Sequence, residues 1–127
     1  LTLKLLQSIK KNQYFYVNNF GNHQRDFTYI DDVIEILYQL LKNFKNTKNF
    51  DYFNICSNKP INLMKAVNYL IKKKNYNKLK KIKLQKADVI KTHGCNKKIL
   101  KIVKFKKFTN IFSGFDQTIK WFDKIEY

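Results

Sequence analysis

Hydrophobic residues in the first part of the chain recur first at a helical spacing and then at a strand spacing. Leu1, Leu5, Leu6 and Ile9 form a helical stripe that is already under way at the first residue. Residues 14–20 are aromatic and β-branched up to Asn18, and Gly21 closes the run, which predicts a strand that ends in a turn. Because the helical stripe has no start signal, we expect the chain to be part of a longer protein.

A second short extended segment is predicted at residues 25–30, followed by an amphipathic helix that ends at about Asn43. Asp32 and Glu35 have the spacing of a capping box, so we interpret Asp31 and Asp32 as helix caps rather than as an acid/base pair. The helix is expected to bury one broad apolar face. That face contains Val33, Ile34, Ile36, Leu37, Leu40, Leu41 and Phe44.

The next segments predict a loop, a strand and a helix. Residues 45–49 are rich in Lys and Asn, and residues 52–56 have the length and composition of a buried strand. Pro60 stands near the start of a helix in which Leu63, Val67, Leu70 and Ile71 recur at helical spacing.

The last third predicts a half-exposed strand at residues 80–85, a short helix at 96–103 and a final amphipathic helix. Ser113 and Asp116 are expected to open that last helix. Its shared face contains Phe115, Ile119, Phe122 and Ile125.

This order of elements predicts an α/β fold in a single unit over residues 1–127, since the chain is long enough for one core and too short for two. The helices that would seal both faces of a parallel sheet are not all present, so we expect the missing part upstream.

The composition changes the picture little, although the formal net charge is +17. Of the 26 cations 25 are lysine, and Arg25 is the one arginine. Base readout and bidentate phosphate binding favour the planar fork of arginine. Lysine spread over every solvated face instead fits a gene with AT-rich codons. We therefore expect no nucleic-acid partner.

Membrane, metal and redox functions have little support. No run approaches the roughly 18 apolar residues of a membrane span, so a cytoplasmic protein without a membrane partner is expected. Cys56 and Cys95 match no metal or redox spacing and are interpreted as reduced, buried thiols. His93 lies close to Cys95, but two ligands without further partners do not predict a metal site.

A family resemblance rests on the segment that begins Asn19-Phe20-Gly21 and continues as Arg25-Asp26-Phe27-Thr28-Tyr29-Ile30-Asp31-Asp32. It resembles the extended short-chain dehydrogenase/reductase superfamily, in particular the NAD-dependent epimerase/dehydratase family and its UDP-glucuronate 4-epimerase branch. Further matching segments occur in the same order, at residues 52–55, 60–64 and 87–89 and in the last helix with Trp121-Phe122.

The resemblance implies a function for the carboxyl-terminal portion of such an enzyme. In that family an upstream Rossmann-type domain holds NAD, and the carboxyl-terminal substrate-binding lobe holds the UDP-sugar while the sugar's C4 is oxidised and then reduced on the opposite face. The full-length protein is expected to be a homodimer. A sister dehydratase or decarboxylase and a lysine-rich nucleic-acid-binding module remain as alternatives.

The NAD-binding and catalytic motifs of that family are absent from this sequence. Its three glycines are far apart, and none opens a helix after a strand. The two Tyr-x-x-x-Lys spacings, Tyr38 to Lys42 and Tyr69 to Lys73, lie within predicted amphipathic helices. We therefore assign no catalytic, cofactor-binding or metal-binding residue, and expect the chain alone to be inactive.

Five residues are candidates for substrate binding by resemblance. Arg25 matches the arginine that grips the diphosphate, and a surface ion pair with Asp26 is the alternative. Asn18 and Phe20 occur where the family strand passes the uracil ring, although strand packing explains them nearly as well. Gln85 and Asp88 match a loop near phosphate and ribose, but the family's proline and glycine are replaced here by Lys86 and Ala87, which puts Gln85 in doubt.

Overall fold

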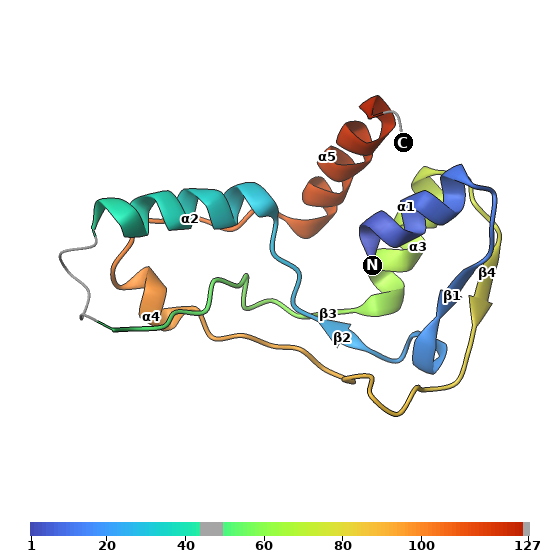
Figure 1. Ribbon diagram of the computed structural model, residues 1–127, viewed down its shortest axis with the longest axis horizontal. Coiled ribbons are helices and arrows are strands. Elements are labelled where there is room, and N and C mark those ends of the chain that lie inside the picture. Colours follow the sequence, from blue (N-terminus) through green and yellow to red (C-terminus); the bar gives the residue numbers. More distant parts are fainter. Residues whose placement is uncertain (44–49, 126–127) are drawn as a thin grey trace.

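The computed structural model describes residues 1–43 and 50–125 and divides into two regions (Figure 1). The first, called the lobe, contains α1 (Thr2–Lys10), β1 (Phe15–Val17), α3 (Leu63–Lys73), β4 (Leu79–Lys81) and α5 (Ile111–Lys124). The second, called the arm, contains α2 (Ile30–Lys42), α4 (Lys97–Leu100) and the irregular chain beside them, residues 50–56 and 101–108. The α/β class is confirmed.

Two small sheets connect these elements. β1 pairs with β4 in parallel, with Phe15 opposite Leu79 and Val17 opposite Lys81. The 3₁₀-helix η1 (Asn18–Gly21) follows β1 and leads to β2 (Gln24–Arg25), which pairs antiparallel with β3 (Ile61–Asn62). The predicted strand at 14–20 is therefore correct only over residues 15–17, because the chain turns at Asn19 and Phe20, which both have positive φ.

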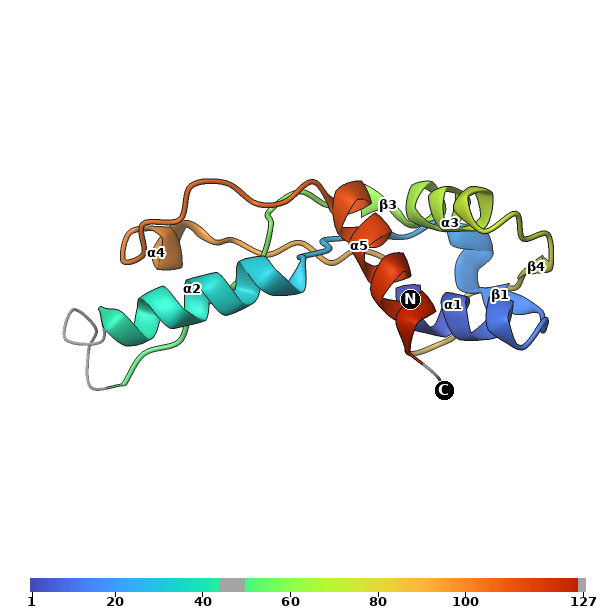
Figure 2. The ribbon, with the colours of Figure 1, turned by 90° about the horizontal axis from the view of Figure 1, so that it is seen from above.

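The lobe has a continuous core between its three helices. Leu5 of α1, Ala66 and Leu70 of α3 and Phe115 of α5 are at most 3% exposed and pack together. Val17 of β1 extends this core across the parallel sheet. Figure 2 shows α5 crossing beside α1, so the last helix of the chain covers the first.

The arm has a smaller core and an open outer face. Ile36 of α2 packs on Ile99 and Val103, and partly buried Phe53 and Ile55 cover them. The predicted broad buried face of α2 is wrong in part: Ile34 is 56% exposed and Leu41 is 72% exposed. Phe44 of that face and the predicted loop at 45–49 lie outside the described residues.

The predicted helix caps are also wrong. The N-cap of α2 is Tyr29, which makes no side-chain capping bond, and both aspartates lie within the first turn. Asp32 is instead buried and accepts hydrogen bonds from the backbone N–H (2.8 Å) and the hydroxyl (2.7 Å) of Thr109. At α5 the cap is Asn110 rather than Ser113, because its side-chain oxygen accepts from the backbone N–H of Phe112.

The strand predicted at residues 52–56 is not formed. Its side chains alternate between exposed and partly buried as a strand requires, but no described segment pairs with its backbone. A strand needs a neighbour for its N–H and C=O groups, so the pattern alone does not produce one. The helix near Pro60 is confirmed, although α3 begins later, at Leu63, where Asn62 caps it.

Candidate functional site

A cavity of about 500 Å³ opens between α1, β1, β2 and the loop that follows β4. Its wall combines apolar side chains, such as Val17 and Leu63, with a small set of charged and polar groups. The charged side chains that line it are Lys4, Arg25, Asp26 and Asp88.

The guanidinium of Arg25 is fixed on one side of the cavity by three hydrogen bonds. Nη1 donates to the backbone oxygens of Gln24 (2.9 Å) and Ile90 (3.1 Å), and Nη2 donates to Asp88 Oδ1 (3.1 Å). An arginine has five N–H groups, so two remain without a protein partner among the described residues. The side chain is 23% exposed, and those two N–H groups are available to a ligand.

Asp88 lies at the centre of the polar cluster. Its Oδ1 accepts from Arg25, and its Oδ2 accepts from the side-chain amide of Asn18 at 3.2 Å. The carboxylate therefore joins the loop after β4 to the end of β1 and to β2. Asp88 is 70 residues from Asn18 and 63 residues from Arg25 in sequence. Backbone bonds between Gln24 and both Ile90 and Thr92 hold this loop beside β2.

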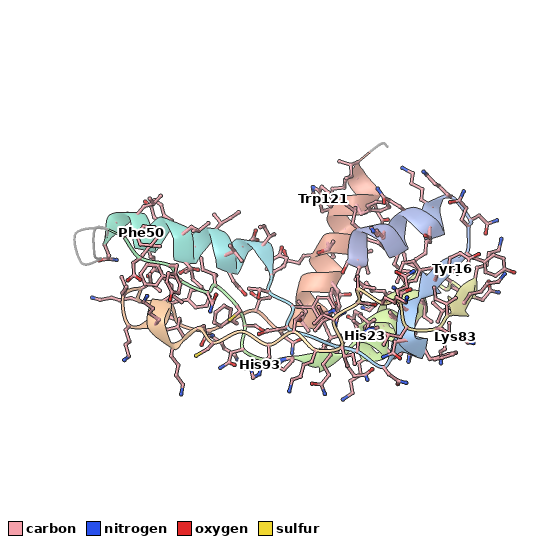
Figure 3. The ribbon with its side chains drawn as sticks, turned by 60° about the horizontal axis from the view of Figure 1, so that its bottom comes forward. Tyr16, His23, Phe50, Lys83, His93 and Trp121 are labelled. Carbon is pink, nitrogen blue, oxygen red and sulfur yellow. The ribbon has the colours of Figure 1, made fainter. Side chains whose placement is uncertain are left out.

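His23, labelled in Figure 3, lies next to Asp88 and is 1% exposed. Its Nε2 lies 3.2 Å from Asp88 Oδ2, without the alignment of a hydrogen bond, and its Nδ1 has no hydrogen-bond partner among the described residues. A buried polar atom without a partner is rare and destabilising. Its main chain is fixed, because its N–H donates to Gly21 and its oxygen accepts from Leu63.

Asp26 has a structural role and is not the partner of Arg25. Its Oδ1 accepts from the hydroxyl of Ser57 (2.6 Å) and the N–H of Lys59 (3.3 Å), and its Oδ2 accepts from the N–H of Gly94 (3.1 Å). These bonds tie three segments together below the cavity. The surface pair of Arg25 with Asp26, considered as an alternative, is therefore not formed.

Three of the five residues proposed from the sequence come together here. Asn18, Arg25 and Asp88 all line the cavity, and both Asn18 and Arg25 donate to Asp88. Phe20 is 50% exposed on η1 and does not line it. Gln85 is exposed and also lies off the cavity wall, and only its backbone oxygen is used, as the acceptor for the N–H of Asp88.

Sequence reasoning missed Lys4, Tyr16 and His23. Lys4 belongs to a helix far from the motif, and no spacing links it to Arg25. Tyr16 shares a predicted strand face with Asn18, so that alternation was a usable signal. His23 stands two residues before Arg25, but nothing in the sequence distinguishes a buried histidine from a loop histidine.

The glycines of the chain are packed against side chains. A Cβ atom on any of the three would meet a neighbouring side chain at 3.0 Å or less, whereas the glycines of a dinucleotide-binding turn lie against the ligand. These pairs are Gly21 with Met64, Gly94 with Cys56 and Gly114 with Tyr29. No group of three or more metal-ligating side chains occurs in the described part of the chain.

The cysteines differ from expectation at one position. Cys56 is buried as predicted, and burial raises the pKa of its thiol. Cys95 is exposed, so the prediction of a buried thiol is wrong there. His93 is exposed and bonds to Asn58, outside the cavity.

Comparisons with known proteins give one family match and several similar proteins. Residues 1–56 match the model of the NAD dependent epimerase/dehydratase family. An uncharacterised protein of Methanocaldococcus jannaschii is 33% identical over 122 residues, which cover 94% of this chain and 36% of that protein.

Within the described residues no helix is long and apolar enough to cross a membrane.

Solved structures share the fold at lower sequence identity. UDP-glucuronic acid 4-epimerase from Bacillus cereus, in complex with UDP-glucuronic acid and NAD, has a TM-score of 0.83 at 18% identity, over 98% of this chain and 40% of that one. TunA, an NAD-dependent NDP-hexosamine 5,6-dehydratase, has a TM-score of 0.83 at 17% identity, over 99% of this chain and 41% of that one. The chain thus spans well under half the length of these relatives.

Proposed function

The chain belongs to the NAD-dependent epimerase/dehydratase family, and on that premise we propose that it is the UDP-sugar-binding part of a nucleotide-sugar 4-epimerase that acts on UDP-glucuronate. Its share of the reaction is to bind and orient the substrate. We assign hydride and proton transfer to groups outside this chain, because the sequence has no glycine-rich dinucleotide turn and its two Tyr-x-x-x-Lys spacings are assigned no chemistry.

The observation that carries the proposal is how the guanidinium of Arg25 is hydrogen-bonded. Its guanidinium is aimed along a cavity wall by two backbone oxygens and one carboxylate, and two N–H groups remain available. A fixed fork of this kind pairs two phosphate oxygens at once. Lys4, on the same cavity wall, adds a second positive charge for a diphosphate.

Asn18 and Asp88 complete the proposed contacts. Asp88 is 22% exposed beside Arg25, where its free lone pairs can accept from the hydroxyls of a ribose. Asn18 is held by Asp88 through its Nδ2, which leaves its amide oxygen free to accept from a base. We place the uracil at the end of β1 and the sugar away from it.

The dinucleotide-binding half is proposed to be a separate part of the same polypeptide, which makes residues 1–127 one carboxyl-terminal portion. The relatives support this, since the chain covers 36% to 41% of their length. The exposed apolar face of α2, with Ile34 and Leu41, is the surface that such a half would cover. We expect no epimerase turnover from the chain by itself.

The first test is calorimetric titration of the chain with UDP-glucuronate. Replacing Arg25 by alanine should weaken binding at least about thirtyfold, since a charge-assisted contact is lost and Asp88 loses its arginine partner. Arg25→Lys should restore only a small part of the lost affinity, because a lysine keeps the charge without the planar fork of N–H groups.

The matched control is Lys83→Ala, which removes an equal charge from the loop beyond β4 and does not line the cavity (Figure 3). This variant should bind UDP-glucuronate like the wild type. Equal losses for Arg25→Ala and Lys83→Ala would mean that general positive charge binds the ligand, which would favour the polyanion-binding alternative.

A dehydratase is the second candidate, favoured by the fold shared with TunA. Product analysis separates the two activities once the NAD-binding half is supplied. An epimerase returns a sugar nucleotide of unchanged mass, whereas a dehydratase returns one that is lighter by one water.

A further inference from the structure

The proposed contacts leave one buried group of the cavity without a role. His23 lines the cavity and is 1% exposed, and neither ring nitrogen has a hydrogen bond within the described part of the chain. The other histidine of the chain, His93, is exposed and bonded to Asn58. A sealed imidazole 3.2 Å from a carboxylate is poised to become an ion pair if it takes up a proton.

The charges around the cavity show when that proton would be favoured. The charged side chains on its wall are Lys4 of α1, Arg25 of β2, Asp26 and Asp88, so two positive charges face two negative ones. A pyrophosphate diester brings two further negative charges. Asp26 already accepts three hydrogen bonds, whereas Asp88 would share its Arg25 partner with a bound phosphate and lies 3.2 Å from His23.

Arg25 cannot serve both anions equally well. Its Nη2 holds Asp88 Oδ1 in the ligand-free protein, and the same nitrogen belongs to the fork that would grip phosphate. When the free N–H groups of Arg25 pair phosphate, its hold on Asp88 is weakened, and Asp88 keeps Asn18 as its other donor. Nε2 of His23 is the nearest unused candidate, on the oxygen that Asn18 already contacts.

We propose that His23 is a proton-linked positioning residue of the diphosphate site, which takes up a proton from the solvent when a nucleotide diphosphate binds and then holds Asp88 as an imidazolium. This inference rests on the proposed function. It assigns to the site a pH dependence in which affinity rises as pH falls, because the ligand favours the charged form of His23.

The test is isothermal titration with UDP-glucose, whose two phosphodiester charges do not change in the range used. The titration is run at about pH 8 and about pH 6, and near pH 7 in two buffers of different ionisation enthalpy. We expect roughly threefold to tenfold tighter binding at the lower pH, and net uptake of up to about one proton per ligand near pH 7.

Two variants assign the proton to a residue. His23→Gln keeps an amide donor for Asp88 without a titrating ring, so UDP-glucose should still bind, with pH dependence and proton uptake lost. His93→Gln removes the exposed histidine and should behave like the wild type. If His23→Gln does not fold by its thermal melt, the two-buffer measurement on the wild type still decides whether a proton is taken up.

The outcomes separate this inference from the proposed function. Binding that depends on Arg25 but shows no proton uptake, or uptake that survives in His23→Gln, overturns the role of His23 and leaves the proposed function standing. An absence of binding at every pH, with UDP-glucuronate as well as with UDP-glucose, overturns both.

Discussion

The lobe and the arm use helices of similar amphipathic character and reach different degrees of burial. In the lobe, Leu70 and Ala66 of α3 are fully buried between two other helices. In the arm, α2 buries Ile36 on one side and exposes Ile34, Leu37 and Leu41 on the other. A helix that is apolar on both sides is typical of a position between two layers. The helices of the lobe thus bury their apolar faces against one another, whereas the arm has a second apolar face to cover.

The two regions also use polar groups differently. The cluster around Asp88 faces a cavity and leaves two N–H groups of Arg25 without a partner among the described residues. The polar link of the arm, Asp32 with Thr109, is closed, because both carboxylate oxygens have a donor. Donors without a protein partner beside a cavity indicate a binding site. A carboxylate with a donor on each oxygen indicates a structural link.

The largest expected effect comes from the core of the lobe. Leu70→Ala leaves a cavity among fully buried side chains and should lower the free energy of unfolding by about 2–5 kcal/mol. Leu41→Ala removes the same atoms from a side chain that is 72% exposed and should change it by less than about 0.5 kcal/mol. Chemical denaturation measures both, and equal losses would contradict the distinction between the regions.

An intermediate effect is expected at the polar link of the arm. Asp32→Asn keeps the size of the side chain but replaces one acceptor of the two Thr109 bonds by a donor, which should cost about 1–3 kcal/mol. Hydrogen exchange should become faster in α2 and stay unchanged in β1. Faster exchange in both elements would show that the arm and the lobe unfold as one unit.

The smallest expected effect is a dependence of stability on pH, caused by a carboxyl group in the lobe. The hydroxyl of Tyr69 donates to Asp116, and together with Lys73 it lowers the pKa of that carboxyl. A lowered folded-state pKa contributes stability above the ordinary aspartate value, and that contribution is lost as pH falls through the acid range. Because the pair is solvent-exposed, the change in melting temperature should be slight. Asp116→Asn should remove this component, and an unchanged acid profile would contradict it.

The success of sequence reasoning differs between local and long-range features. The helices were predictable because hydrophobic periodicity and a Pro signal are local, as at α3 near Pro60, whereas its Asn62 cap was not foreseen. The strand at 52–56 failed because pairing depends on a neighbour that the pattern does not contain. Asn18, Arg25 and Asp88 were found through the family motif, not through any spacing. His23 was missed because its burial depends on how β2, α3 and the loop after β4 pack around it.

The most direct test is a crystal structure of the chain with UDP-glucuronate bound. The account predicts that two phosphate oxygens lie about 2.7–2.9 Å from the free N–H groups of Arg25, with Asp88 beside the ribose. It would be contradicted by a diphosphate bound elsewhere on the surface while Arg25 keeps its contacts to Gln24, Ile90 and Asp88 and no ligand atom enters the cavity.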